Sequence, residues 1–261
     1  MEDKDFLWLN LRELPYFRAM LRAVEAQFYQ EFELAAPTLD LGCGDGHFAL
    51  ITFNRKIDVG LDPWAGPIHQ AAQAGGYHSL VQADGEKIPF PEAYFASAIS
   101  NSVLEHIPHV QGVLAELRRV LKPEAQFIFC VPNPRYLSEL SVPAFLGKIG
   151  LKRMGKAYAD WFMRMSRTHH AVEPEIWENW LKEAGFRLER YWHYFSPQAL
   201  HILEWGHYFG APTLLPHAIW KRWIIAPWRW NLALTEYIVR RHVIAEPHPQ
   251  GAYTFFVARS I

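Results

Sequence analysis

Short apolar runs, each bounded by polar or turn-forming residues, recur along the middle of the chain. Five of these runs have the length and composition of strands: residues 38–41, 57–61, 79–83, 95–100 and 126–131. Most are separated by connections long enough for a crossover, as strands in a parallel sheet require. Two later runs, 187–195 and 252–259, also predict strands. The alternation with helices predicts an α/β fold with a doubly wound, mostly parallel sheet of seven strands.

Apolar residues at helical spacing predict the connecting elements. Residues 5–34 carry apolar side chains every three or four positions, which predicts one or two amphipathic helices. Residues 110–121 form one apolar stripe, and the lysine–proline pair at 122–123 ends it. Residues 174–184 have proline in the first turn, and Gly185 is the stop signal that follows them.

Two segments lie outside this alternation. Residues 136–170 and 197–249 interrupt the pattern, and the second segment is rich in Trp, His and Arg. We interpret both as helical insertions that form a cap over the ligand-binding edge of the sheet. The prediction is a single domain over residues 1–261, with an N-terminal helical segment at 1–34.

Composition narrows the class of protein. The 261 residues include 26 basic and 27 acidic side chains, and this net charge of −1 argues against a general nucleic-acid binder. The two cysteines, Cys43 in a loop and Cys130 in an apolar run, do not suggest a disulfide framework. No signal peptide fits the residues after Met1, and no apolar run is long enough to span a membrane. We therefore expect a cytoplasmic protein.

A glycine-rich stretch, LDLGCGDGH at residues 39–47, follows the first predicted strand. His47 stands where the dinucleotide-binding pattern G-x-G-x-x-G needs its third glycine, and the Gly-Lys-Ser/Thr ending of a P-loop is missing. Asp40 precedes the glycines, which suits a ligand with an ammonium group and a carboxylate, such as S-adenosylmethionine. Loop amides would take the carboxylate and Asp40 the ammonium group. A structural turn that caps the next helix explains the loop equally well.

Acidic residues at the ends of the next two strands favour the ligand over the turn. Asp62 follows the second run, about twenty residues after the loop, where an acid accepts ribose hydroxyls. Asp84 and Gly85 follow the third run, where a carboxylate and a backbone amide can recognise adenine. Carboxyl ends of parallel strands form the edge where open α/β sheets bind ligands.

These stretches resemble class I S-adenosylmethionine-dependent methyltransferases. The resemblance rests on LDLGCGDG, VGLDP, ADGEKIPFP and SNSVLEHIPH in this order, followed by VLAELRRVLKPEAQFIFCVPNP. It covers residues 36–134 well and 171–196 more loosely. Within the group, the chain is most similar to the small-molecule and lipid branch that includes quinone-biosynthesis methyltransferases.

The resemblance implies a role for each residue of the methionine half of the site. Gly42, Gly44 and Gly46 would border that half, and Asp40 would assist its ammonium group. Asn101, at the end of the fourth predicted strand, would offer its backbone carbonyl to the same amine.

The resemblance also implies the nucleoside half. Asp62 would bind the ribose, and Asp84 with Gly85 would bind the adenine. The chain departs from the family at 124–125, where Glu-Ala replaces a common glycine pair. It also lacks the Asp/Asn-Pro-Pro-aromatic signature after Ile99, which disfavours methylation of nucleic-acid bases.

Methyl transfer from a sulfonium is an in-line displacement, so the protein mainly aligns the reactants and sometimes removes a proton. The resemblance therefore implies transfer to an oxygen or carbon of a small-molecule or lipid-like acceptor, with S-adenosylhomocysteine as product. His106 and His169 are the candidate bases, because histidine suits neutral pH. A loop-orienting role for His106 and surface roles for His169 and His170 are the alternatives. No Cys/His cluster has metal-ligand spacing, and we expect no metal.

The two insertions combine aromatic and basic residues. Residues 148–168 contain six basic residues and one acidic residue, and WKRWIIAPWRW at 220–230 is similar in character. The cap could touch a membrane surface or admit a long apolar acceptor. We favour the alternative that most of these tryptophans pack on the core under a solvated basic face.

Two other functions remain open at this point. One is a non-catalytic adaptor that binds S-adenosylmethionine or a membrane with the same fold. The other is a nicotinamide-dependent oxidoreductase, which the glycine spacing disfavours.

Overall fold

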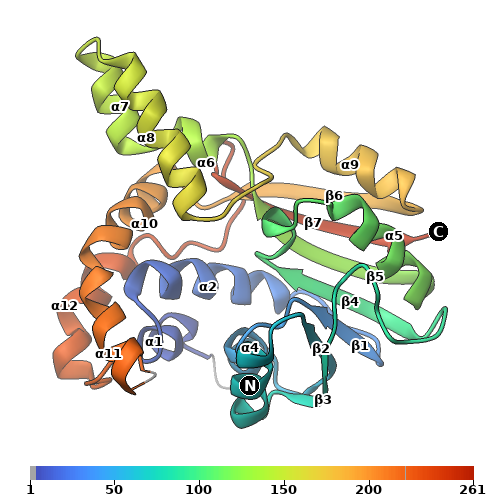
Figure 1. Ribbon diagram of the computed structural model, residues 1–261. Coiled ribbons are helices and arrows are strands. Elements are labelled where there is room, and N and C mark those ends of the chain that lie inside the picture. Colours follow the sequence, from blue (N-terminus) through green and yellow to red (C-terminus); the bar gives the residue numbers. More distant parts are fainter. Residues whose placement is uncertain (1–3, 221) are drawn as a thin grey trace.

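The computed structural model describes residues 4–220 and 222–261. Seven strands form one sheet in the order β3-β2-β1-β4-β5-β7-β6 (Figure 1). The strands are β1 (Thr38–Leu41), β2 (Ile57–Asp62), β3 (Tyr77–Gln82), β4 (Phe95–Asn101), β5 (Leu121–Pro132), β6 (Phe186–Tyr194) and β7 (Tyr253–Ser260). Strand β7 runs antiparallel to β5 and β6, and the other pairs are parallel. The predicted doubly wound, mostly parallel sheet is confirmed.

Helices cover both faces of the sheet. The N-terminal half contributes α1 (Phe6–Leu11), α2 (Tyr16–Tyr29), α3 (His47–Thr52), α4 (Ala65–Ala74), the 3₁₀ turn η1 (Leu104–His106) and α5 (Val110–Val120). The C-terminal half contributes α6 (Arg135–Ser138), α7 (Ser141–Lys148), α8 (Lys152–Met165), α9 (Pro174–Glu183), α10 (Pro197–Phe209), the 3₁₀ turn η2 (Ala211–Thr213), α11 (Leu214–Trp220) and α12 (Arg229–Arg240).

One boundary differs from the expectation. Helix α5 ends at Val120, and β5 starts at once with Leu121, so the lysine–proline pair lies within a strand rather than in a turn. The pairing of β4 with β5 shifts register between Phe95 and Ser97, and Glu124 adopts a φ of +61°. This irregularity lets the strand begin five residues before the predicted run. Pairing across the sheet, which sequence periodicity does not report, decides where the strand begins.

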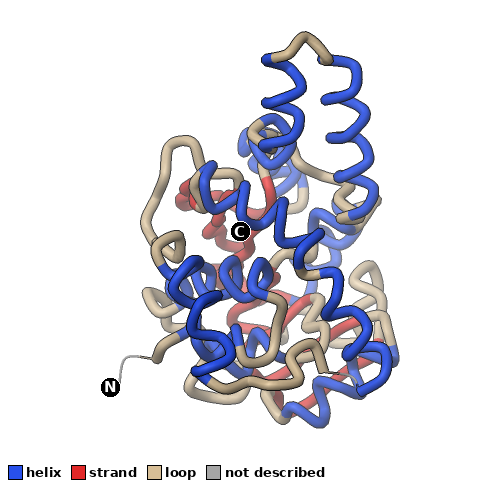
Figure 2. The backbone as a smooth tube through the Cα atoms, turned by 90° about the vertical axis from the view of Figure 1, so that its left-hand side faces the viewer, coloured by secondary structure: helices blue, strands red, loops and turns tan. Residues whose placement is uncertain are grey.

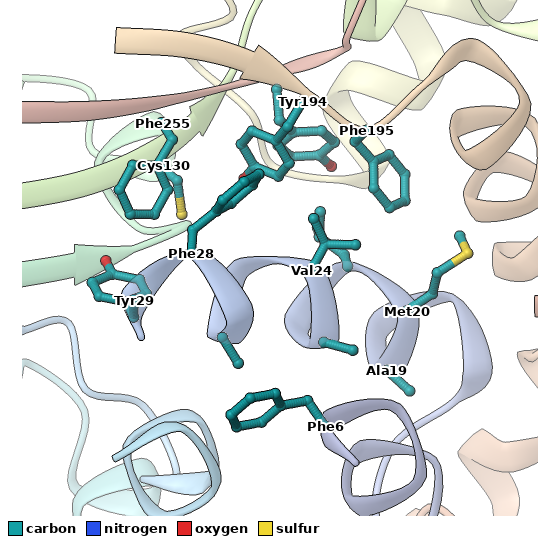
Figure 3. Close-up of a cluster of buried hydrophobic side chains, with 14 of the residues drawn as sticks. Phe6, Ala19, Met20, Val24, Phe28, Tyr29, Cys130, Tyr194, Phe195 and Phe255 are labelled. Atoms are coloured by element: carbon teal, nitrogen blue, oxygen red, sulfur yellow. The ribbon is translucent and has the colours of Figure 1, made fainter. Parts of the chain in front are cut away.

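Helix α2 is the central element of one face. It is rich in alanine and has no β-branched run, so it forms a helix readily after Pro15. Phe28 points toward the sheet, with ring centroids 5.3 Å from Tyr194 and 5.5 Å from Phe255, while Ala19 lies on the side of α1 and Phe6 (Figure 3). Each fully buried aromatic ring contributes about 1.5–3 kcal/mol of transfer free energy.

Helices α5 and α9 cover the opposite face. The apolar stripe of α5 is buried as predicted, and Trp177 of α9 lies 5.4 Å from the ring of Phe129 on β5. Because Phe129 alternates with Ile128 along β5, the two side chains enter the cores on opposite faces of the sheet. Helix α2 on one side and α5 with α9 on the other therefore fix the sheet edge between them.

The two insertions differ in placement. Helices α7 and α8 form an antiparallel pair that projects from the body of the protein (Figures 1 and 2). The second insertion packs α10 and α12 against the N-terminal helices α1 and α2. Within the described residues, no helix is both long and apolar enough to cross a membrane.

The tryptophans of the insertions are more exposed than expected. Trp161, Trp220, Trp228 and Trp230 are all exposed, and Trp230 keeps 75% of its surface accessible. Only Trp223 among the tryptophans of these two stretches packs partly against the core. The expectation that most of them pack on the core is wrong: α8 projects from the body (Figure 1), and the tryptophans at 220, 228 and 230 are turned to solvent.

Candidate functional site

A cavity of about 630 Å³ lies at the carboxyl ends of β1, β2 and β4. Of the predicted ligand-binding residues, those that line it are Asp40, Gly42, Gly44, Asp62, Asp84, Gly85 and Asn101. His106 also lines it, whereas Gly46 and His169 do not. The parallel topology brings these residues together from four separate stretches of the chain. The volume lies within the ~300–1,000 Å³ that is usual for small-molecule sites.

The glycine loop is held in a left-handed conformation that few other residues adopt. Gly42 has a φ of +80°, and a Cβ atom there would lie 2.3 Å from Cγ1 of Val103. Gly44 has a φ of +55° but borders open space, so its backbone faces the cavity. Gly42 is thus required by close packing, and Gly44 keeps the cavity wall free of a side chain.

The loop amides are already engaged within the protein. The amides of Gly42 and Cys43 donate to the carbonyl of Leu61 at 2.8 and 3.0 Å, and that of Gly44 donates to Asp62 Oδ2 at 3.1 Å. The amide of Gly46 donates to the carbonyl of Cys43. A ligand carboxylate, which we expected to accept these amides, would therefore compete with the hydrogen bonds that hold the loop on β2.

Asp62 is ordered by the backbone around it. Its Oδ2 accepts the amide of Gly44, and its Oδ1 accepts the amide of Trp64 at 2.9 Å. Each carboxylate oxygen has a second lone pair for a further donor. The carboxylate is thus fixed at the cavity with capacity to accept two hydroxyl groups.

Asp40 is almost fully buried at the base of the cavity. The hydroxyl of Tyr77 donates to its Oδ2 at 2.6 Å. Burial raises the pKa of Asp40 to about 7, against the opposing effects of the Tyr77 hydrogen bond and the Arg22 charge. A cationic group placed beside Asp40 would restore the charged form. Sequence reasoning missed Tyr77, whose position at the start of β3 gives no sign of this contact.

Asp84 and Gly85 lie in the loop beyond β3, which ends at Gln82, one residue earlier than expected. Asp84 is exposed, and its Oδ1 accepts the amide of Glu86 at 2.9 Å. A Cβ atom on Gly85 would lie 3.1 Å from Cγ1 of Val113. This end of the cavity is consequently open to solvent and bounded by backbone.

Asn101 closes the opposite end. Its side chain donates from Nδ2 to Glu25 Oε2 at 2.7 Å and accepts from Cys130 Sγ at 2.9 Å. Its backbone carbonyl, the group singled out by the resemblance, lies 3.4 Å from an Arg22 guanidinium nitrogen. The side chain is therefore structural, and only the backbone faces the cavity.

Glu25 is the centre of a buried network that sequence reasoning missed. Its carboxylate is inaccessible to solvent and accepts four hydrogen bonds. The donors are Arg22 (2.7 Å), Asn101 (2.7 Å), Ser102 (3.1 Å) and Tyr194 (2.9 Å). The network ties α2 to the ends of β4 and β6. A single acidic residue in an apolar helical stripe was the one available signal.

Two arginines from α2 line the cavity beside the glycine loop. Burial opposes the charge of Arg22, but the neighbouring Glu25 carboxylate raises the pKa of the guanidinium above its usual value. The guanidinium of Arg18 lies over the ring of Trp223 at 5.7 Å, and burial lowers its pKa. In the described part of the chain, Arg18 has no ion-pair partner within 4 Å. The cavity thus offers a cation that is available to an anionic ligand group.

The predicted histidines occupy different environments. His106 Nδ1 contacts the carbonyl of Arg167 at 2.9 Å, and burial lowers the pKa of its imidazole. His169 is exposed, and its amide donates to the carbonyl of Glu105. His170 contacts the carbonyl of Ile107 and packs edge-on against Trp180, which is a structural role. Over residues 4–220 and 222–261, no three His, Cys, Asp or Glu side chains form a group that could hold a metal.

Comparison with known proteins identifies the kind of domain. Residues 39–129 match a family described as "Methyltransferase domain". This segment of the chain is therefore similar to methyltransferase domains. The matched segment runs from β1 into β5 and contains Asp40, Asp62, Asp84 and Asn101.

Relatives of this methyltransferase domain extend over more of the chain. The "Biotin biosynthesis bifunctional protein BioHC" of Saccharophagus degradans is 29% identical over 178 residues, which are 66% of this chain and 29% of that protein. An "Uncharacterized methyltransferase" of Mycobacterium sp. (strain JLS) is 28% identical over 213 residues, 79% of this chain and 74% of its own. An "Uncharacterized methyltransferase" of Mycobacterium marinum is 32% identical over 123 residues, 46% and 44% of the two chains. The match thus spans less than half of two of these relatives.

Solved structures share the fold of the methyltransferase domain. The crystal structure of the "[4+2]-Cyclase SpnF" has a TM-score of 0.56 at 16% identity, covering 93% of this chain and 80% of its own. A S-adenosylmethionine-dependent methyltransferase of Thermotoga maritima, described as a possible histamine N-methyltransferase, has a TM-score of 0.54 at 14% identity, covering 94% and 90%. At these identities, the likeness concerns the fold alone.

Proposed function

We propose that this chain transfers a methyl group from S-adenosylmethionine to an oxygen or carbon of a small-molecule or lipid-like acceptor. The observation that carries the proposal is the order of acids along one cavity. Asp40, Asp62 and Asp84 follow one another from its buried base to its open end. This order matches the ammonium group, the ribose and the adenine of the donor.

The cavity fits the donor chemically. Asp40 and the carbonyl of Asn101 would hold the ammonium group, Asp62 the ribose hydroxyls, and Asp84 with Gly85 the adenine. For the methionine carboxylate we propose Arg18 and Arg22, because most of the amides of the glycine loop are bonded within the fold. When bound, S-adenosylmethionine supplies a methyl group that its sulfonium already activates.

The residues of the chain would then orient the reactants and exclude water. The buried network around Glu25 fixes the cavity wall, so the acceptor is held in line without the entropy cost of assembling the site. His106 and His169 are our proposed bases from the sequence. The position of His106 in the cavity wall favours it over His169.

Isothermal calorimetry tests the donor site. S-adenosylmethionine and S-adenosylhomocysteine should bind the wild-type protein. Asp62→Ala removes a proposed contact to the ribose, and Gly44→Val places a side chain in the cavity wall, so each should weaken binding at least tenfold. Glu178→Gln, an exposed change on α9, is the matched control. Unchanged affinity in both site variants would remove this assignment.

A non-catalytic role for the same fold is the second candidate. SpnF, which is named as a [4+2]-cyclase, has a similar fold, so this fold by itself does not establish methyl transfer. The discriminating measurement is formation of S-adenosylhomocysteine from S-adenosylmethionine in the presence of fractionated cell extract. Binding without turnover in any fraction would favour the adaptor.

We also propose that the cap makes peripheral contact with a membrane from the cytoplasmic side. Helix α12 carries large apolar residues at helical spacing that are all exposed, namely Trp230, Leu234, Tyr237 and Ile238. Arg222, Arg229 and Arg241, within and around this helix in the sequence, are also exposed, as expected at an anionic lipid surface.

Vesicle flotation tests this contact. The protein should float with vesicles that contain phosphatidylserine at low salt, and Trp230→Glu combined with Leu234→Glu should keep it in the bottom fraction. Ile176→Glu, at an exposed apolar position on α9, controls for a general loss of hydrophobicity. Absence of wild-type protein from the lipid fraction would contradict the proposal.

A further inference from the structure

A second cavity of about 230 Å³ adjoins the donor cavity. The two cavities share four lining residues: Arg18, Arg22, Ser102 and His106. The second cavity extends from there toward Tyr136, Thr168 and Tyr253. A molecule in it would therefore lie beside the methionine end of the proposed donor site, where an acceptor must be.

Glu105 of η1 lines this second cavity and has no role in the donor site. Only 3% of the residue is accessible, and its Oε2 is sealed from solvent without a hydrogen-bond partner among the residues that the structure describes. Burial raises the pKa of the carboxyl to about 8, while the charge of Arg22 opposes the shift. The backbone carbonyl of Glu105 accepts the amides of His169 at 2.7 Å and His170 at 3.1 Å, which fixes η1.

His106 connects Glu105 with solvent. Its Nδ1 must donate, because the partner at 2.9 Å is the carbonyl of Arg167. The lone pair of a neutral ring is then on Nε2, which lies 3.8 Å from Glu105 Oε1. The imidazole side chain is 43% accessible, so a proton that reaches Nε2 can leave to water.

We propose, on the basis of the methyl transfer proposed above, that the second cavity receives a hydroxyl group of the acceptor and that Glu105 is the catalytic base for it. His106, the base expected from the sequence, is then not the group that takes the hydroxyl proton but the one that carries it onward from Glu105. The cavity is smaller than the ~300 Å³ at which complete ligand sites begin, so only the reacting end of the acceptor enters.

Charge and polarity favour a hydroxyl over the other nucleophiles. Arg18 and Arg22 line the cavity, and two guanidinium groups disfavour an ammonium ion there. A carbon nucleophile offers no strong donor to a buried carboxylate, whereas a hydroxyl does. Among hydroxyls, a phenol has a pKa of about 10, which is closer to the pKa of Glu105 than the pKa of an aliphatic alcohol is.

The proposed step balances in atoms and charge. The acceptor oxygen forms a bond to the methyl carbon as the carbon–sulfur bond breaks, and that electron pair stays on the sulfur of the neutral thioether. The hydroxyl proton passes to the carboxylate of Glu105, then to Nε2 of His106 and to water. One proton is released for each methyl group transferred.

Binding of two small probes tests the proposal without knowledge of the natural acceptor. Phenol and anisole have the same ring, but only phenol can donate a hydrogen bond. With the protein saturated by S-adenosylhomocysteine at pH 9, calorimetry should give a Kd for phenol at least tenfold below that for anisole. Glu105→Leu should reduce the preference to threefold or less, and Glu178→Gln should preserve it.

A measurement on the wild-type protein guards against a misfolded variant. The preference for phenol should fall between pH 9 and pH 6.5, as the Glu105 carboxylate becomes protonated. The charged and titratable groups that face Glu105 from neighbouring elements are Arg22, Glu25, Cys130, Tyr136 and Tyr253. Arg22, Cys130 and both tyrosines have raised pKa values, and they keep one state over this range.

The outcomes separate this proposal from the methyltransferase function. Equal binding of the two probes, no binding of phenol, a preference that survives Glu105→Leu, or a preference independent of pH would each overturn the role of Glu105. If S-adenosylhomocysteine itself fails to bind, the proposed function falls, and this inference falls with it.

Discussion

Replacing Glu25 by alanine should destabilise this protein more than almost any other single change. The carboxylate is fully buried and accepts hydrogen bonds from Arg22, Asn101, Ser102 and Tyr194. Its removal leaves the Arg22 guanidinium without its ion-pair partner and three polar groups without theirs. Water can reach these groups only through the space that the truncated side chain vacates.

The magnitude follows from the worst of these losses. Breaking a buried ion pair by removal of one partner costs about 3–5 kcal/mol, and each stranded neutral donor adds up to about 1 kcal/mol. Because part of the network relaxes, we expect a total of about 4–5 kcal/mol. That is a large fraction of the ~5–15 kcal/mol by which domains are usually stable.

Urea denaturation followed by circular dichroism measures the loss directly. Glu25→Ala should lower the free energy of unfolding by about 4–5 kcal/mol and the Tm by roughly 8–20 °C. Glu25→Gln, which keeps the shape and two hydrogen bonds, should lose about half as much. Glu33 is an exposed glutamate shortly after α2, and Glu33→Ala should change the free energy of unfolding by less than ~0.5 kcal/mol.

One result would refute the reasoning. A loss below ~1 kcal/mol in Glu25→Ala, with an unchanged denaturant slope, would mean that α2 does not depend on this carboxylate. A changed slope would instead indicate an altered unfolded state and call for Glu25→Gln as the deciding variant.

Other predictions test the donor site and its loop. Burial raises the pKa of Asp40 to about 7, so folding favours its protonated form. The contribution of Asp40 to the free energy of unfolding should therefore fall as pH rises from ~4 to ~7. Asp40→Asn should remove this pH dependence, as measured by urea titrations at several pH values. Binding of the cationic donor at pH 6.5 should release protons, because Asp40 ionises beside the ammonium group. Calorimetry in buffers of different ionisation enthalpy measures this release, and Asp40→Asn should abolish it. Tyr77→Phe should weaken donor binding by about 3- to 10-fold at pH 7, because the Asp40 carboxylate loses a donor. Gly42→Ala should cost about 2–4 kcal/mol of stability, since its Cβ would lie 2.3 Å from Val103 at a positive φ, and Val103→Ala in the same chain should recover part of the loss.

The residues of the proposed donor site were easier to predict than the groups around them. Asp40 lies one residue before the end of β1, and Asp62 and Asn101 end β2 and β4. These strands are parallel, so their ends meet at one edge of the sheet. Position in the strand pattern was therefore enough to place them in one cavity. Tyr77 and Glu25 act through contacts across 37 and 76 residues of chain, which no local pattern reports.

The insertions mark another limit of local pattern. Both segments were interpreted as helical insertions because they interrupt the strand–helix alternation. The side of each helix that meets the body depends on how α10 and α12 pack against α1 and α2. Trp223 is turned toward the cavity, whereas Trp228 and Trp230 are turned to solvent. Residues of one type, a few positions apart, thus end in opposite environments.

The amino-acid sequence alone determined the sheet, the helices on its faces and the motifs of the proposed donor site, because strand periodicity and glycine spacing are local properties of the chain. Only the tertiary structure decided which polar and charged groups are available to a ligand in the cavity. Folding engages most of the glycine-loop amides, raises the pKa of Asp40 and brings Arg18 and Arg22 to the cavity. It also leaves Glu105 buried beside His106 in a second cavity. These features depend on desolvation and on contacts between distant segments, which arise only when the chain is packed.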